Sequence, residues 1–168
     1  MLIINSTQAD IDAIFELYDV ATAHQKAVAE KHWLGFERTM VETEIREQRQ
    51  YKIMENDQIA CVFAVTFSDL AIWQDRNADP SIYIHRIATN PKFRGNHFVK
   101  IIVAWAKDFA VKNALSYIRM DTGSGNDKLN NYYVSCGFEY LGITKLGDAK
   151  DLPEHYKKGD SSLFEIKI

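Results

Sequence analysis

The sequence predicts one domain of the α/β class, with a mixed sheet and helices on both of its faces. Apolar-rich runs at 51–54 and 59–67 flank a polar turn at 55–58 and predict a hairpin. An apolar run over 81–89 then leads through a short basic loop into an amphipathic helix over 98–113, which predicts a strand–helix–strand unit. With 168 residues, of which 46% are hydrophobic, the chain has enough apolar content for a single core.

The other elements follow from capping residues and from the period of the apolar positions. Ser6 or Thr7, together with Asp10, predicts a helix N-terminus before the run IDAIFELYDV. In chain order we expect a strand over 2–5, a helix from 11 to about 31, a helix over 36–50, the hairpin, a loop over 69–80, the strand and helix described above, a strand over 117–121, a helix over 127–135, and strands over 138–143 and 162–168.

Composition argues against several classes of function. The net charge is −3 and the chain has no block of Lys or Arg, which argues against nucleic-acid binding and electrostatic attachment to a membrane. No apolar run is as long as a membrane span, and no basic region followed by an apolar one opens the chain, so we expect a cytoplasmic protein. Cys61 and Cys136 lie in apolar patterns and predict no disulfide, and no residues have the spacing of metal ligands.

The segment that most strongly predicts a binding function joins the strand over 81–89 to the helix that begins near Phe98. Its residues Arg94 to Val99 lead into the first turn of that helix, where backbone N–H groups have no partner within the helix. The helix dipole adds partial positive charge at the same place, so such a loop suits a phosphate group. The alternative is an ordinary strand-to-helix turn with a solvated Arg94.

Two blocks of residues resemble the GNAT superfamily of acyl-CoA-dependent N-acetyltransferases. The family has a strand that reads into V-x-P-x-(aromatic)-R-G-x-G-x-(G/A), and later N-x-x-(apolar)-x-x-x-Y-x-x-x-G-F. The second pattern is met in full, by Asn126, Leu129, Tyr133, Gly137 and Phe138. The first is met at Pro91, Phe93, Arg94 and Gly95, and it differs at Thr89, His97 and Val99, where the family usually has Val, Gly, and Gly or Ala.

The resemblance implies a fold and a co-substrate. The fold is a mostly antiparallel, twisted sheet whose central strands splay apart to hold CoA. The co-substrate is acetyl-CoA, with its pantetheine along the strand and its pyrophosphate on the loop, and no metal is needed. The residues that would bind it are Ile87, Ala88, Thr89, Arg94, Gly95, Asn96, His97, Phe98, Val99 and Asn126.

Two residues are candidates for the proton transfers of an acetyl transfer. The resemblance places Tyr133 beside the thioester sulfur as the proton donor to the leaving thiolate. A tyrosine that only packs against the sheet is the alternative, and the adjacent Tyr132 fits that role better because it points about 100° away. His85, in the strand before the loop, is the candidate base for an ammonium acceptor, since His titrates near neutral pH. A packed sheet histidine is equally compatible with its position.

The acceptor is expected to be the primary amine of a small molecule. The residues that would line its pocket are Trp33, Phe36, Trp73 and Tyr83, although packing at the edge of the core explains the same aromatic residues. Two alternatives stay open. One is a protein or peptide acceptor, and the other is a degenerate GNAT-like module that binds CoA weakly or interacts with a partner without catalysis. A homodimer is compatible with all three.

Overall fold

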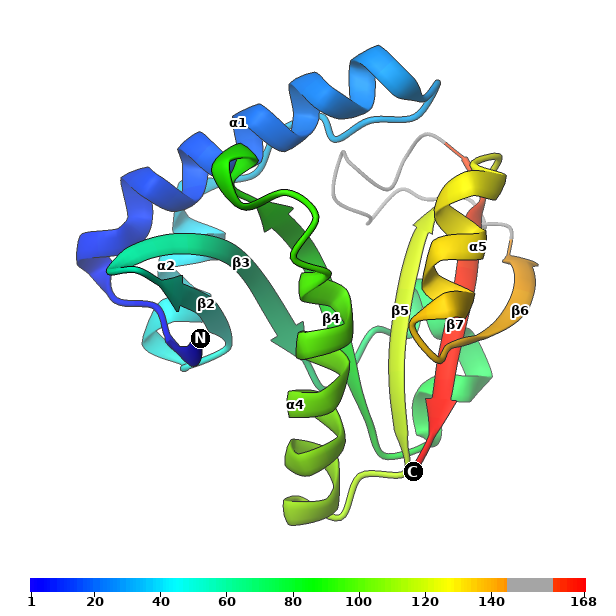
Figure 1. Cartoon of the computed structure of the whole chain (residues 1–168). Coiled ribbons are helices and arrows are strands. Elements are labelled where there is room, and N and C mark those ends of the chain that lie inside the picture. Colours follow the sequence, from blue (N-terminus) through cyan, green and yellow to red (C-terminus); the bar gives the residue numbers. More distant parts are fainter. Residues whose placement is uncertain (145–158) are drawn as a thin grey trace. The chain divides into compact units, whose positions relative to one another are not determined.

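The computed structural model describes residues 1–144 and 159–168 (Figure 1). They form two compact units, which are described separately: unit 1 is Met1–Val65 with His85–Phe98, and unit 2 is Thr66–Ile84 with Val99–Ile168. The seven strands have the order β1-β2-β3-β4-β5-β7-β6. Strands β4 and β5 pair in parallel, whereas β1–β2, β2–β3, β5–β7 and β6–β7 pair antiparallel. The predicted α/β class with a mixed, mostly antiparallel sheet is therefore confirmed, while the single domain over 1–168 stays a prediction.

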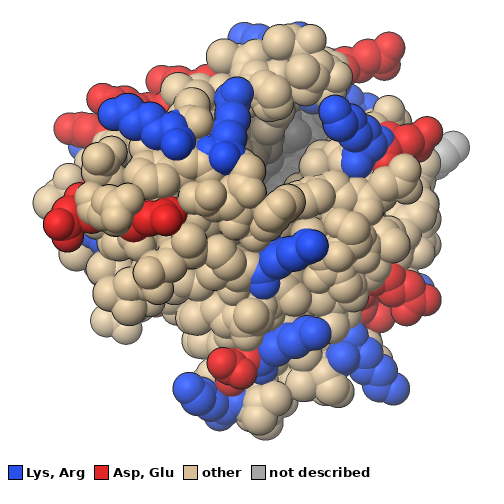
Figure 2. Space-filling view, viewed as in Figure 1, with Lys and Arg blue, Asp and Glu red and all other residues tan. Residues whose placement is uncertain are grey.

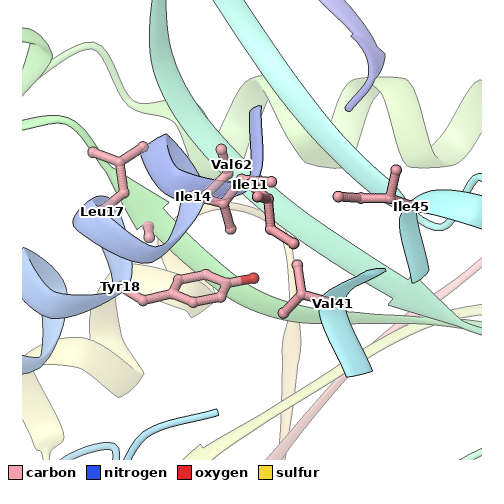
Figure 3. Packing of buried hydrophobic residues seen from close by; sticks show 8 residues of the cluster. Ile11, Ile14, Leu17, Tyr18, Val41, Ile45 and Val62 are labelled. Atoms are coloured by element: carbon pink, nitrogen blue, oxygen red, sulfur yellow. The ribbon is translucent and has the colours of Figure 1, made fainter. Parts of the chain in front are cut away.

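Unit 1 combines a hairpin with two helices. Its elements are β1 (Leu2–Asn5), α1 (Ile11–Val28), α2 (Arg38–Arg46), β2 (Gln50–Glu55), β3 (Gln58–Thr66) up to Val65, and the second half of β4 (Ser81–Thr89). The hairpin turn has Asn56 and Asp57 at φ of 50° and 58°, the left-handed conformation that Asn and Asp accept in two-residue turns. The buried core of this unit packs α1 against α2 and β3 (Figure 3). It contains Ile11, Ile14, Leu17 and Tyr18 of α1, Val41 and Ile45 of α2, and Val62 of β3.

Unit 2 contains the first half of β4 and the remaining elements. These are α3 (Leu70–Trp73), a 3-10 helix (Gln74–Ala78), α4 (Phe98–Lys112) from Val99 onward, β5 (Tyr117–Gly123), α5 (Asp127–Ser135), β6 (Glu139–Thr144) and β7 (Ser161–Lys167). One buried cluster unites Ile72 and Trp73 with Tyr83 of β4 and Leu163 of β7. Phe164, the next residue of β7, is 0% exposed, and its ring contacts the ring of Tyr133 of α5.

Two expected elements are corrected by the structure. The segment 69–80, expected to be a loop, contains α3 and the 3-10 helix, because Ile72 and Trp73 are buried and draw the segment into the core. The helix expected over 36–50 ends at Arg46, because Gln48 has a φ of 58° and Gln50 already pairs with Ala64 in the sheet. Chain reversal by a left-handed residue is a common helix ending, but it usually has Gly in that place.

Two further observations concern the surface charge and the hydropathy of the described residues. On the face drawn in Figure 2, the Lys and Arg side chains of the described residues are interspersed with Asp and Glu. In the part of the chain that the structure describes, no helix has the length and apolar character needed to cross a membrane.

Candidate active site

The loop after β4 is anchored by Asn90. The Asn90 amide Nδ2 donates to the Ile59 carbonyl at 3.0 Å, and its backbone N–H donates to the Ala60 carbonyl at 2.9 Å. The Asn90 Oδ1 accepts from the Lys92 N–H at 3.1 Å, which caps the 3-10 turn Pro91–Phe93. These bonds tie both ends of the asparagine side chain, so the loop begins at a defined place on β3.

The loop before α4 contains two residues of positive φ. Arg94 is extended, with φ −60° and ψ 145°, Gly95 has φ +89°, and His97 has φ +53°. Turns that contain left-handed residues are a recurring setting for anion binding by successive backbone N–H groups. A Cβ at Gly95 would meet no atom within 4 Å, so the glycine is needed for its backbone conformation and not for space. His97 adopts a conformation that Gly usually provides.

The loop residues directly before α4 are exposed. Phe98 and Val99 are buried, with 3% and 8% of their surface exposed, whereas Gly95 and His97 are exposed. The Asn96 amide Nδ2 donates to Glu55 Oε2 at 3.0 Å, which links the loop to the hairpin. Of the two departures from the family pattern in this stretch, the His97 residue is therefore exposed, whereas the Val99 side chain is buried.

The second half of β4 carries the strand residues predicted to bind the co-substrate. Ala88 is 0% exposed within the unit 1 core, and Ile87 and Thr89 are half-buried. The Thr89 hydroxyl donates to Cys61 Sγ at 3.8 Å. Burial raises the pKa of the Cys61 thiol to about 12, so the thiol stays protonated and the sulfur is a packing atom. His85 is half-buried at the start of this half, and its role as a base stays a prediction.

A buried ion pair lies one residue after His85. Arg86 Nη2 donates to Glu44 Oε2 of α2, and Arg86 Nε donates to the Tyr18 hydroxyl at 3.2 Å. Arg86 has a φ of +50°, so a left-handed residue interrupts the alternation of side chains along β4. The sequence pattern showed neither this conformation nor the partners, which come from two helices distant in the chain.

Unit 2 holds the other predicted residues on α5. The Asn126 Oδ1 accepts from the Leu129 N–H at 3.0 Å, so Asn126 is the N-cap of the helix. Tyr133 lies two helical turns further on, with its ring at 5.2 Å from that of Phe164 in an edge-on contact. Burial, with smaller contributions from Tyr132, Cys136 and Asp121, raises the pKa of the Tyr133 phenol above its ordinary value. The phenol is thus protonated at neutral pH, as a proton donor must be.

Two carboxyl groups of unit 2 were not predicted. Burial and the charge of Asp69 raise the pKa of Asp121 to about 7, although a hydrogen bond from Ser161 at 3.4 Å opposes this. Burial likewise raises the pKa of Asp69 to about 6. The sequence offers little signal for them beyond a single aspartate within β5, and like charges in a buried place are known to hold a proton at near-neutral pH.

The four predicted acceptor-pocket residues pack in two separate clusters. In unit 1, Trp33 and Phe36 contact the Tyr18 ring at centroid distances of 5.8 and 5.1 Å. In unit 2, Trp73 and Tyr83 are 2% and 0% exposed and lie 5.7 Å apart. The packing explains why all four are aromatic, and their contact with an acceptor stays a prediction.

Trp73 and Tyr83 border a buried cation that the sequence did not indicate. Arg119 of β5 is 1% exposed and donates to Glu165 at 2.7 Å and to Asp79 at 2.8 Å. Its guanidinium lies 4.9 Å from the Trp73 ring centroid. A third hydrogen bond, to the Arg76 carbonyl at 2.5 Å, fixes the 3-10 helix that follows α3.

The family of the chain follows from comparison with known proteins. Residues 22–138, more than half of the chain, match the acetyltransferase (GNAT) family. The loop before α4 and the capped helix α5 with Tyr133 both lie within this range. The chain belongs to the GNAT family of acetyltransferases.

Individual relatives agree with this assignment. The chain is 29% identical over 79 residues to the uncharacterized N-acetyltransferase YesJ of Bacillus subtilis, an alignment that spans 47% of this chain and 44% of YesJ. A GNAT-family acetyltransferase from Listeria monocytogenes has a TM-score of 0.77 and 20% identity, over 99% of this chain and 94% of that one. The yncA structure from Salmonella typhimurium, which contains its cofactor acetyl-CoA, has a TM-score of 0.68 and 14% identity over 99% and 93%. The two structural matches show the fold alone.

Proposed function

We propose that this chain transfers the acetyl group of acetyl-CoA to the primary amine of a small molecule. The observation that carries the proposal is the backbone of the loop before α4, in which Gly95 and His97 both have a positive φ. This conformation supports binding of the CoA pyrophosphate by N–H groups between Arg94 and Val99. It does so although a histidine occupies the place of the family's second glycine.

The rest of the co-substrate is assigned to β4 and α5. The pantetheine amides pair with backbone groups of Ile87 to Thr89 in unit 1, and Asn126 in unit 2 contributes a contact to CoA. A backbone N–H near Ala88 polarises the thioester carbonyl, because a fixed donor in a site sheltered from water stabilises the charge that develops on the oxygen. No metal is part of the proposal, and the reaction is expected to continue in the presence of a chelator.

The chemistry is direct attack by the amine. The acceptor ammonium loses a proton to His85 or to a water, and the amine nitrogen attacks the thioester carbonyl carbon. The C–S bond breaks as the carbonyl re-forms, and the Tyr133 hydroxyl gives its proton to the departing thiolate. The nitrogen releases its second proton to water as the amide forms, and Tyr133 is reprotonated from water. The raised pKa of Tyr133 supports this role, since the phenol arrives protonated. The proposal places the protein in the cytoplasm and leaves a homodimer open.

Two experiments in sequence test the proposal. Isothermal titration with acetyl-CoA comes first, and a wild-type protein that releases no heat on titration and shows no thermal shift would favour an interaction module without catalysis. Thiol release with a panel of amines, amino acids and peptides comes second. Turnover with small amines is expected, whereas turnover with peptides alone would replace the small-molecule acceptor by a protein.

A further inference from the structure

Arg86 has a backbone conformation that its residue type does not favour. Its φ is +50° in the middle of β4, where a side chain with a Cβ crowds the following carbonyl. A conformation of this kind persists only where the surroundings hold it in place, and such residues gather at functional sites. The next residues along the strand, Ile87 to Thr89, are those that the proposed function pairs with pantetheine.

The surroundings that hold Arg86 come from both helices of unit 1. Glu44 of α2 accepts from Nη2, and the Tyr18 hydroxyl of α1 accepts from Nε at 3.2 Å. The guanidinium also lies 5.2 Å from the centroid of the Phe36 ring. The Arg86 and Glu44 side chains are only 10% and 9% exposed, so solvent screens the pair weakly. The arginine is thus fixed by its far end as well as by the strand.

In this network Arg86 is charged and the Tyr18 hydroxyl is neutral. Burial alone lowers the pKa of Arg86, but Tyr18 and Glu44 outweigh it and raise the pKa above its ordinary value, so the guanidinium is charged. Burial raises the pKa of Tyr18, so its neutral hydroxyl accepts from Arg86 and donates to Gln50 Oε1 at 3.4 Å. Removal of either member of a buried ion pair leaves an uncompensated charge, so the pair acts as a unit.

We propose that Arg86 is a positioning residue of the acetyl-CoA site. Its bonds to Glu44 and Tyr18 hold its own backbone left-handed, and this sets the direction of the peptide groups of Ile87 and Ala88. A left-handed residue in a strand rotates the following peptide groups relative to those before it, as in a β-bulge. An extended residue at position 86 would turn the same groups away from their present direction. The inference rests on the proposed function, because pantetheine pairing gives those groups their role.

Substitution by alanine and by glycine separates the backbone from the ion pair. Both Arg86→Ala and Arg86→Gly remove the guanidinium, but only glycine adopts a positive φ without strain. Both are made in the Glu44→Gln background, in which no unpaired buried charge remains to unfold the protein. We expect acetyl-CoA Kd, measured by isothermal titration, to rise at least about tenfold above wild type for the alanine variant and to stay within about threefold of wild type for the glycine variant.

A matched pair elsewhere in unit 1 serves as the control. Gln48 lies in the exposed turn after α2, outside β4, and also has a positive φ, of 58°. Gln48→Ala and Gln48→Gly impose the same backbone change, and we expect acetyl-CoA Kd to stay unchanged for both. The fraction of protein that binds, read from the stoichiometry, separates a loss of folded protein from a change in Kd.

The outcomes distinguish the inference from the function on which it rests. Recovery by glycine but not by alanine supports the positioning role. Equal Kd values for the alanine and glycine variants, whether weak or as tight as wild type, overturn it and reduce the ion pair to a structural contact. A wild-type protein that fails to bind acetyl-CoA overturns the proposed function itself, which the variants then cannot rescue.

Discussion

In unit 1 the groups assigned to acetyl-CoA belong to the main chain, whereas in unit 2 they belong to side chains. The loop from Arg94 to Phe98 offers N–H groups that any residue except proline provides, so its requirement is a conformation. On α5 the proposed requirement is chemical identity, since Asn126 and Tyr133 are proposed to act through an amide and a phenol. If the proposal is right, a change of residue type is tolerated among the main-chain groups of unit 1 and not among the side chains of unit 2.

The two buried arginines follow the same division. Arg86 in unit 1 sits on a left-handed residue of β4 and has one carboxylate partner, Glu44. Arg119 in unit 2 lies in a regular strand, bonds to the two carboxylates of Asp79 and Glu165, and also holds a backbone carbonyl of the segment after α3. The first arginine thus constrains its own backbone, and the second constrains a neighbouring segment.

The largest effect is expected from a change in the side-chain half. Tyr133→Phe removes only a hydroxyl, so the fold and acetyl-CoA Kd should be kept while kcat falls roughly 10- to 1000-fold if that hydroxyl donates the proton. Steady-state kinetics and isothermal titration measure the two quantities. Tyr132→Phe is the control. An equal loss of kcat in both variants would show that Tyr133 is wrongly assigned as the proton donor.

A second side-chain effect concerns the base. If His85 removes the acceptor proton, the rate with a good acceptor rises with pH on an acidic limb, and that limb should vanish in His85→Gln with the rate lowered about 10-fold or more. Acetyl-CoA Kd should be unchanged. An acceptor of lower pKa provides the control, because a limb that moves with the acceptor and survives in His85→Gln would leave His85 as a packing residue of the sheet.

Sequence patterns predicted the bounds of the elements that carry the candidate side chains. Asn126 and Gly137 delimit α5, and the helix expected over 127–135 has those bounds in the structure. The strand over 81–89 is likewise observed with its predicted bounds. Local signals suffice here, since a cap, a helical period and a terminal glycine are all read from neighbouring residues.

The buried networks were not predictable by the same means. The partners of Arg86 are 42 and 68 residues away in the chain, and those of Arg119 are 40 and 46 residues away. Nothing local to either arginine marks it as buried, because Arg is usually exposed. The helix α3 was missed for a related reason, since its four residues are too few to show a period.

The proposed role of the main-chain groups in the loop before α4 is best tested at Gly95. Gly95 has a φ of +89°, whereas proline is restricted to about −65° and removes an N–H as well. Gly95→Pro should therefore weaken acetyl-CoA binding more than tenfold, about 1.4 kcal/mol, in isothermal titration. Gly35 of unit 1 also has a positive φ, of +104°, and lies outside the loop, so Gly35→Pro should leave Kd unchanged. Unchanged affinity in Gly95→Pro would remove the loop from the site.

The carboxyl pair of unit 2 predicts a pH dependence of stability. The pKa of Asp121 is raised from 3.8 to about 7, so the folded state holds a proton that the unfolded chain releases above pH 3.8. Stability from this group is therefore fully present below about pH 4 and is lost as the pH rises to about 7. Asp121→Asn should flatten the decrease of the unfolding free energy over this range in urea titrations. The exposed Asp108 gives the control, since Asp108→Asn should reproduce the wild-type profile. A wild-type profile that rises with pH over this range would contradict the assignment.

The smallest effect is expected at His97, where the main-chain interpretation is tested most directly. His97 has a φ of +53° in the place of a family glycine, and its imidazole is the one side chain of the loop that departs from the pattern and is exposed. If only the backbone N–H groups bind phosphate, His97→Gly should leave acetyl-CoA Kd within about threefold, because glycine keeps the conformation and the donors. The unfolding free energy should change by no more than about 1 kcal/mol, since the relief of left-handed strain is offset by the greater freedom of glycine in the unfolded chain.

His97→Ala is the matched variant, because it also lacks the imidazole but keeps a Cβ at positive φ. A weaker Kd for alanine than for glycine would mean that the backbone conformation decides binding. A Kd raised tenfold or more in both variants would show instead that the imidazole itself contacts the phosphate. The loop would then contribute a side chain as well as main-chain groups.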